Sequence, residues 1–195
     1  MSNGTRGRLS EDVNSYINAR ALRGIAKTAA PSLAISILLF VSAGRLDWTM
    51  AWLGPVAIAL VAGFDLRYGW QPEVSPLVQG AGALAVVFGY AVVLWAMATN
   101  RFFSGVVRIQ EERGHTVVGH GPYALVRHPG YVGVSLAALG APLMLGSAWA
   151  LIPAAATIVV IVVRTAYEDR TLVRDLAGYE AYARRVRYRL LPGIW

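Results

Sequence analysis

The chain has 195 residues, of which 56% are hydrophobic and 15% are charged, and its formal net charge is +7. This length suits one domain, and the composition is too apolar for an ordinary soluble protein, so we expect an integral membrane protein. The sequence contains no cysteine, which excludes disulfides, thiolate metal sites and a cysteine nucleophile. The arginines cluster between and after the apolar runs, which favours anionic lipid headgroups over nucleic acid as partners of the positive charge.

The N-terminal segment, residues 1–27, is polar at first and then mixes apolar and basic residues, as is typical of a helix lying in the membrane interface. We recognise no secretory signal, because the first apolar run begins late and no small-residue cleavage site precedes it. The following apolar runs predict membrane helices over residues 28–43, 48–64 and 77–98. We interpret residues 28–98 as a three-helix membrane scaffold.

A long polar connection follows at residues 99–128, with many arginines, glycines and aromatic residues. Connections of this length in a compact domain are usually functional or disordered, and the aromatic residues and glycines favour an ordered, functional segment. We interpret His115 and His120 within it as solvated loop residues. With His128 they are the three histidines of the chain, and no His-Glu-x-x-His pattern occurs, so we expect no metal site.

The stretch from Gly121 to Gly133 combines a basic side chain, an imidazole, a proline turn and two tyrosines. Pro129 fixes its own φ near the helical value and pushes His128 towards an extended backbone, so a helix is expected to begin there. Gly130 and Gly133 then lie one turn apart on one face of that helix. They leave a strip without side chains, where a planar ligand or another backbone can approach.

Two further apolar runs, residues 131–145 and 148–163, are separated by a Gly-Ser turn. They predict a helical hairpin that returns the chain to the side it left. Arg164 ends the hairpin, and the charged residues after it indicate a helix that has left the hydrocarbon. The predicted fold is therefore all-α, a polytopic membrane helix bundle of about five transmembrane helices with a C-terminal helical hairpin.

The tail is expected to form a separate short helix, because Gly178 can interrupt the preceding one. In that helix Tyr179, Tyr182 and Val186 share one face, beside several arginines. With five spans, the polar connection and the tail lie on one side of the membrane, and their arginines predict that this side is cytoplasmic. The basic residues of the N-terminal segment then lie outside, a conflict that an interfacial rather than crossing segment relieves.

The hairpin brings Arg127 and His128 close to Arg164 and Glu168 at one membrane surface. Such a cluster can hold a water-soluble zwitterion by its carboxylate and amine while a lipophilic partner enters from the membrane. This arrangement suggests group transfer between two phases.

The order of motifs resembles that of the isoprenylcysteine carboxyl methyltransferase and phospholipid methyltransferase superfamily, over roughly residues 77 to 195. The motifs are Asn100-Arg101-Phe102-Phe103-Ser104, Gly114-His115, Gly121-Pro122-Tyr123, Val126-Arg127-His128-Pro129-Gly130-Tyr131, Arg164 with Glu168-Asp169, Gly178-Tyr179-Glu180-Ala181-Tyr182 and Arg189-Leu190-Leu191-Pro192. The first two predicted spans carry no such resemblance.

The resemblance implies S-adenosylmethionine as methyl donor in a cytosolic cofactor pocket, and residues 99–195 as the catalytic part. Carried over position by position, the residues that would contact the cofactor are Tyr123, Arg127, His128, Pro129, Tyr131, Gly133, Glu168, Tyr179 and Tyr182. Arg164 and Asn100 would face the methyl acceptor, with Glu168 as a further catalytic residue. The chain departs from the superfamily pattern at Asp169, where a second glutamate is usual, and at Gly130, where a bulkier residue is common.

Each of these side chains also has a simpler interpretation. Arg127 and Arg164 can snorkel to lipid headgroups from helix ends, and His128 can cap its helix. The four tyrosines can serve as interfacial anchors. A carboxylate at the end of a span, such as Glu168, is costly without a purpose and is the hardest to explain in this way.

Methyl transfer from a sulfonium is an in-line displacement in which positioning dominates when the acceptor is already anionic. Arg164 could hold a substrate carboxylate, and Glu168 could orient the cofactor or accept a proton from an amine. The leading hypothesis is carboxyl O-methylation of a prenylcysteine-type acceptor. The alternatives are N- or S-methylation of a phospholipid or small molecule, an NADPH-dependent membrane reductase with a similar C-terminal part, and a scaffold without catalysis. The sequence does not determine the oligomeric state.

Overall fold

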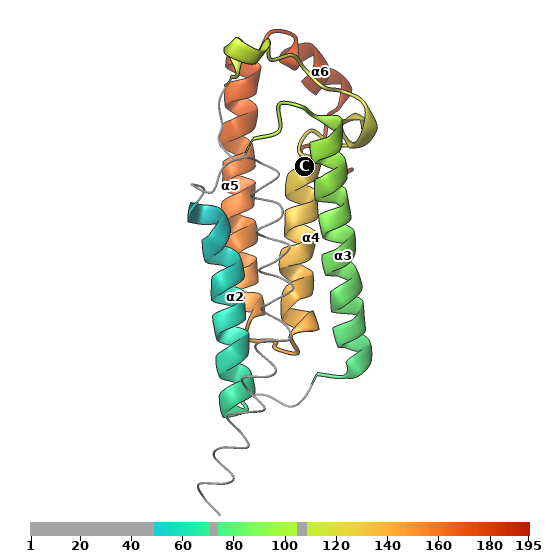
Figure 1. The fold of residues 1–195 in the computed structure, drawn as a ribbon. Coiled ribbons are helices and arrows are strands. Elements are labelled where there is room, and N and C mark those ends of the chain that lie inside the picture. Colours follow the sequence, from blue (N-terminus) through green and yellow to red (C-terminus); the bar gives the residue numbers. More distant parts are fainter. Residues whose placement is uncertain (1–48, 71–73, 105–108) are drawn as a thin grey trace, which may run out of the picture.

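The structure is a computed structural model that describes residues 49–70, 74–104 and 109–195 (Figure 1). All regular secondary structure in these ranges is helical. The α-helices are α2 (Thr49–Tyr68), α3 (Pro76–Thr99), α4 (Pro129–Met144), α5 (Leu151–Asp175) and α6 (Tyr179–Arg185), and the 3-10 helices are η1 (Glu111–Arg113) and η2 (Gly121–Ala124). The predicted interfacial segment, residues 1–27, and the helix predicted over residues 28–43 lie outside the described residues.

The described helices cover most of the predicted apolar runs, and two of them continue well past the end of their run. The helix α5 continues from the run 148–163 to Asp175 and includes the charged segment that was expected to leave the hydrocarbon, and α2 also ends later than predicted. This helix was expected to end at Phe64 but continues through Asp65 to Tyr68. It ends where Gly69 adopts the left-handed conformation, with φ of 62°, and donates a hydrogen bond of 2.8 Å to the Asp65 carbonyl. The helix therefore continues past Asp65 and Arg67 and stops at a glycine that adopts the left-handed turn, so a charged side chain alone does not end it.

The start of α4 is as predicted, because Pro129 occupies its first turn and His128 is its N-cap residue. The His128 backbone has φ of −127° and ψ of 62°, outside the helical region, as expected for a residue before proline. Pro76 has the same place in α3, where the Ser75 hydroxyl accepts a hydrogen bond of 3.4 Å from the Val78 amide. Two of the main helices thus begin at proline.

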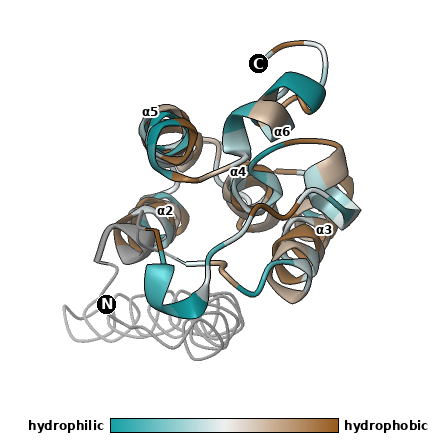
Figure 2. Cartoon of the chain, turned by 90° about the horizontal axis from the view of Figure 1, so that it is seen from above, coloured by the Kyte–Doolittle hydropathy of each residue, from teal (hydrophilic) through white to brown (hydrophobic). Residues whose placement is uncertain are grey.

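The helices α2, α3, α4 and α5 run side by side, and α4 lies at the centre in contact with the other three (Figures 1 and 2). Between α3 and α4 the backbones approach closely at two pairs of glycines, Gly82 with Gly140 and Gly89 with Gly133. A Cβ atom added at Gly89 would lie 2.6 Å from the Gly133 carbonyl oxygen, and one added at Gly82 would lie 2.7 Å from that of Gly140. The two helices can therefore pack at this separation only with glycine at these positions.

The helix α2 packs against the first half of α5. Ile58 and Ala62 of α2 form a buried cluster with Ala150 and Ala154, and Gly54 lies against Thr157. Residues near the start of α2 thus meet later residues of α5, so the two helices are antiparallel. The end of α2 lies at the end of the bundle where α4 and α5 are joined.

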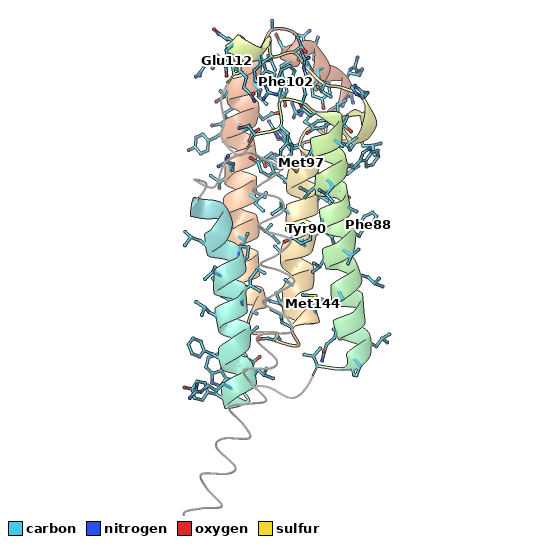
Figure 3. All side chains as sticks on the ribbon, viewed as in Figure 1. Phe88, Tyr90, Met97, Phe102, Glu112 and Met144 are labelled. Carbon is cyan, nitrogen blue, oxygen red and sulfur yellow. The ribbon has the colours of Figure 1, made fainter. Side chains whose placement is uncertain are left out.

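Two of the described helices, α3 and α5, are long and apolar enough to cross a membrane. Only 28% of the apolar window of α3 and 17% of that of α5 is buried inside the protein, whereas core helices of soluble proteins are mostly buried. Large apolar side chains such as Phe88, 63% exposed, project from α3 away from the bundle (Figure 3). These outward surfaces suit a protein that lies in a membrane.

The connection between α3 and α4, the helix α6 and the C-terminal tail gather at the opposite end of the bundle from the α4–α5 turn (Figure 1). There Leu176, Tyr179, Tyr182 and Val186 form a buried cluster against residues 109 and 117 of the connection. Gly178 separates α5 from α6 with a φ of 82°. The predicted break at this glycine and the shared face of the two tyrosines are confirmed.

Candidate functional site

The hairpin of α4 and α5 folds back as predicted and brings two distant segments together. At 1.5 Å per residue, the 16 residues of α4 span about 24 Å and the 25 residues of α5 about 37 Å, so α5 reaches past the start of α4. As a result Arg127 Nη1 lies 3.2 Å from Asp169 Oδ2. The start of one helix and the acidic end of the other therefore form one cluster.

Asp169 is the centre of this cluster and is 2% exposed. One of its oxygens, Oδ1, accepts a hydrogen bond of 3.0 Å from the Tyr179 hydroxyl and lies 3.4 Å from His128 Nε2. The other, Oδ2, accepts a hydrogen bond of 2.9 Å from Arg189 Nε and faces Arg127. The carboxylate is thus paired with two guanidinium groups, which offsets the desolvation of a buried charge.

The backbone of the tail pairs with the residues that precede α4. The Arg127 amide donates to the Tyr188 carbonyl at 2.9 Å, and the His128 amide donates to the Arg189 carbonyl at 3.0 Å. Arg127 itself is 8% exposed, and its Nε atom is buried with no hydrogen-bond partner among the described residues. A buried N–H without a partner is costly, so this atom is a donor that a further group could use.

Beside Asp169, a second polar chain joins Arg164, Tyr131 and Glu168. Arg164 Nε donates a hydrogen bond of 2.6 Å to the Tyr131 hydroxyl, which donates one of 2.6 Å to Glu168 Oε2. The three side chains are partly exposed, unlike Asp169. The Tyr131 ring also stacks on the His128 ring, with centroids 5.8 Å apart and planes 19° apart. The two chains of contacts are therefore joined through these rings.

Tyr123 and Asn100 lie at the edge of the cluster, where α3 ends. Burial raises the pKa of Tyr123 to about 12, although its side-chain hydrogen bond with Asn100 acts in the opposite direction. The Tyr123 carbonyl accepts a hydrogen bond of 2.7 Å from the Tyr182 hydroxyl, and burial raises the pKa of Tyr182 as well. Both phenols are hydrogen-bond donors at neutral pH and can serve as neutral polar groups next to a ligand.

Residues 82–174, from α3 to the end of α5, match the family model described as the isoprenylcysteine carboxyl methyltransferase (ICMT) family. This part of the chain is therefore similar to the ICMT family. A probable protein-S-isoprenylcysteine O-methyltransferase of rice, Oryza sativa subsp. indica, is 33% identical over 136 residues, which are 68% of this chain and 63% of the relative. The protein-S-isoprenylcysteine O-methyltransferases of Rattus norvegicus and Mus musculus are each 30% identical over 146 residues, 73% of this chain and 48% of the relative.

The chain thus spans 63% of the rice relative and 48% of the rat and mouse relatives. The matched family region contains the parts of α4 and α5 that carry Tyr131, Arg164, Glu168 and Asp169. It ends before α6 and the tail, which complete the cluster through Tyr179 and Arg189. The methyl-donor and acceptor roles of the individual residues therefore remain predictions.

The glycine strip expected at the start of α4 is filled by other parts of the chain. A Cβ atom added at Gly130 would lie 2.7 Å from the Phe103 ring, and one added at Gly133 would lie 2.4 Å from the Gly89 carbonyl oxygen. Of the two expectations for this strip, the approach of another backbone is the one that the structure confirms at Gly133. Phe103 occupies the space that a bulkier residue at position 130 would need, which explains this departure from the superfamily pattern.

His115 was expected to be solvated, and this interpretation is wrong. The ring is half-buried and packs on Phe102 with centroids 4.5 Å apart, and its Nδ1 atom accepts a hydrogen bond of 3.3 Å from the Gln110 amide. Burial lowers the pKa of His115, and the nearby Arg113 lowers it further. The loop therefore uses a neutral histidine as a structural acceptor. His120 is exposed, as expected.

Asp169, Arg189 and Gln110 were missed as important residues. Gln110 is 2% exposed and donates a hydrogen bond of 2.8 Å to the Phe102 carbonyl, which orders the polar connection. Asp169 and Arg189 were quoted within motifs, and Asp169 also as a departure from the usual glutamate, but neither was predicted as a site residue. The position of Asp169 next to Glu168 was the available signal, because two neighbouring acids at the end of an apolar helix need cationic partners.

Proposed function

We propose that this chain is an integral membrane methyltransferase that transfers a methyl group from S-adenosylmethionine to the carboxylate of a prenylcysteine-type acceptor. The observation that carries the proposal is the contact chain from Arg164 through Tyr131 to Glu168. It connects the Arg164 guanidinium, which can pair with a carboxylate, to the Glu168 carboxylate, which can accept a hydrogen bond from an amine or hydroxyl. Both groups lie at the end of apolar helices. The relatives named protein-S-isoprenylcysteine O-methyltransferase support this choice of acceptor.

The residues present fit the proposed methyl donor. S-adenosylmethionine carries a carboxylate, an ammonium group and hydroxyls. The cluster offers Arg127 Nε, which has no partner among the described residues, the partly exposed Glu168 carboxylate and the phenols of Tyr131 and Tyr123. The cluster thus offers both charged and neutral hydrogen-bonding groups for these parts of the donor. We propose that these groups hold the donor, together with His128, Pro129, Tyr179 and Tyr182 as the surrounding wall; Gly133, which was also expected there, packs against Gly89 of α3 instead.

When bound, S-adenosylmethionine supplies a methyl group that is electrophilic because it is attached to a sulfonium. Arg164 would pair with the acceptor carboxylate and fix the direction of its attacking oxygen, and we propose that Asn100, which contacts Tyr123, also faces the acceptor. Glu168 would hold the donor by accepting a charge-assisted hydrogen bond from its ammonium group or a hydroxyl. A carboxylate acceptor is already ionised at neutral pH, so no general base is needed and the rate depends on orientation.

We propose that the cluster lies on the cytoplasmic side of a bundle of about five transmembrane helices. The described residues at this end include more arginines than acidic residues, which favours the cytoplasmic side. The arginines are Arg101, Arg113, Arg127, Arg164, Arg170, Arg174, Arg184, Arg185, Arg187 and Arg189, and the acids are Glu111, Glu112, Glu168, Asp169, Asp175 and Glu180. The described residues of the opposite end carry Asp65 and Arg67.

The decisive experiment is a transfer assay with S-adenosylmethionine labelled in its methyl group and the full chain in lipid vesicles. The acceptor is a farnesylated cysteine derivative with a free carboxylate, and the control is the same compound as its amide. We expect label in the free acid and none in the amide, and the product ester should release volatile label in base.

Parallel reactions with phosphatidylethanolamine and with a lipophilic thiol test N- and S-methylation. Transfer to either of these acceptors but not to the free acid would replace the proposed acceptor. Calorimetry with S-adenosylmethionine and with NADPH separates the methyltransferase from a reductase. Binding of neither compound would reject both enzymatic functions.

A further inference from the structure

Asp169 joins three segments that are far apart in the sequence. Its oxygens contact Arg127 and His128 before α4, and Tyr179 and Arg189 in the tail, within 3.4 Å. The acid side chain is 3% exposed, and that of Arg127 is 7% exposed, so these contacts are shielded from water. One carboxylate thus links the side chains of the tail to those before α4, beside the two backbone hydrogen bonds between the same segments.

The contacts continue from Asp169 to the partly exposed residues. The carboxylate contacts the His128 ring, the His128 ring stacks on Tyr131, and the Tyr131 hydroxyl donates to Glu168. A shift of the imidazole would therefore tilt the Tyr131 ring. It would also move the Tyr131 hydroxyl, which donates the hydrogen bond to Glu168. Asp169 can influence the exposed part of the cluster without contacting a ligand itself.

The neighbouring acid differs in this respect. Glu168 is partly exposed and accepts from Tyr131, whereas Asp169 is fully surrounded by groups of this chain. The side chains of two adjacent residues on a helix point about 100° apart around its axis. For this reason Glu168 faces the partly exposed side of the cluster and Asp169 faces its interior. The shorter aspartate side chain is sufficient here because Arg189 and Tyr179 of the tail approach it.

We propose that Asp169 is a positioning residue of the methyl-donor site, holding the His128 imidazole and the tail in the arrangement that the donor requires. This inference rests on the proposed function. Removing the charge would leave Arg127 and Arg189 without their shared anion, and the His128 ring without its partner. Small displacements of aligned groups can reduce binding or rate by about 100-fold.

The test compares Asp169→Asn, which keeps the shape and removes the charge, with Asp169→Glu, which keeps the charge. The matched control is Asp175→Asn, on the same helix, because Asp175 pairs with the exposed Arg174. Each full-length variant in detergent micelles is titrated with S-adenosylmethionine by calorimetry. We expect the affinity for S-adenosylmethionine to fall by about 10- to 100-fold in Asp169→Asn and by less than about 10-fold in Asp169→Glu. The affinity of the control should be unchanged.

A second readout separates positioning from general stability and needs no donor. The chain has three histidines, so imidazole NMR signals after selective ¹⁵N labelling can be assigned to His128 with a His128→Gln variant. We expect the His128 signals to move in Asp169→Asn and to stay in place in Asp175→Asn. If Asp169→Asn does not fold, Arg189→Gln takes its place. In that variant we expect the His128 signals to move and S-adenosylmethionine to bind about 10-fold more weakly.

Unchanged donor affinity and unchanged His128 signals in the folded variants would overturn the proposal. An equal loss in Asp169→Asn and Asp169→Glu would also overturn it, because side-chain shape rather than charge would then be decisive. A wild-type chain that binds no S-adenosylmethionine would instead reject the proposed function. In that case the His128 signals would still report whether Asp169 holds the imidazole.

Discussion

The α3–α4 interface and the polar cluster at the end of the bundle are held together by different means. At the interface Gly89 and Gly133 allow the two backbones to touch, and α3 and α4, both fully described, contain no charged residue. In the cluster the carboxylates of Glu168 and Asp169 are paired with arginine, histidine and tyrosine side chains. The first region depends on shape, and the second on paired charge.

The difference follows from the surroundings of the two regions. Between helices in lipid, apolar side chains gain little by leaving the solvent, so close packing of small residues supplies the attraction. At the end of the bundle, ionised groups can be paired and partly hydrated, which makes them available for a polar ligand. Substitutions in the first region should therefore reduce folding, and substitutions of the partly exposed Glu168 and Tyr131 in the second should mainly reduce activity.

The largest effect is expected for Gly89→Leu. A Cβ atom at this position would lie within 2.8 Å of backbone atoms of α4, which cannot move aside as a flexible side chain can. The helices must separate, and we expect the free energy of unfolding to fall by about 3 kcal/mol or more. The readout is the disappearance of the monodisperse peak in size-exclusion chromatography. The control is Gly80→Leu on the same helix, where nothing lies within 4 Å, and it should fold normally. Equal yields of the two variants would contradict the packing argument.

Glu168→Gln should have the next largest effect, on activity. The change removes the charge that accepts the Tyr131 hydrogen bond while keeping the side-chain shape. We expect methyl transfer, measured as kcat/KM for the donor, to fall by about 100-fold, as for loss of a charge-assisted hydrogen bond. Glu180→Gln is the control, because this exposed acid pairs with Arg184 in α6 and should leave the rate unchanged. Similar rates for the two variants would exclude a role for Glu168 in the reaction.

Tyr131→Phe should have a smaller effect on the same rate. It keeps the ring that stacks on His128 and removes the hydroxyl between Arg164 and Glu168. Because the two charged groups can still approach each other, we expect only about a 10-fold lower kcat/KM. Tyr167→Phe, on the exposed side of α5, provides the comparison and should retain full activity. A fully active Tyr131→Phe would show that the hydroxyl does not contribute.

The smallest effect is a pH dependence of the polar connection through His115. Its pKa is lowered in the folded chain from a value of 6.5, so the folded state binds fewer protons there than the unfolded state. The stabilisation is fully present above about pH 6.5 and is lost as the pH falls below it. Hydrogen exchange of residues 109–117, corrected for its intrinsic pH dependence, should be faster at about pH 5.5 than at about pH 7.5.

The pH effect should be absent in His115→Gln, which cannot titrate. It should persist in His120→Gln, because His120 is exposed. Persistence of the full effect in His115→Gln would assign it to another group.

The positions of the helices could be predicted from the sequence, because each pattern reflects a local preference of the backbone or of apolar side chains. Apolar runs of sufficient length predicted α2 to α5, and Pro129 and Gly178 correctly predicted a helix start and a helix break. The short turn between α4 and α5 also required them to fold back, so the meeting of residues 127–128 with residues 168–169 could be predicted. These conclusions need only chain connectivity and local backbone preferences.

Only the tertiary structure decided which side chains pair across the cluster. The hairpin could be foreseen, but the packing of α6 that brings Tyr179 and Arg189 to Asp169 could not, because it depends on contacts with the polar connection. In the same way, Gly133 could have faced a ligand or a helix, and its contact with Gly89 follows from how α3 and α4 lie together. The sequence specifies which groups are available, and the relative placement of the helices determines which of them meet.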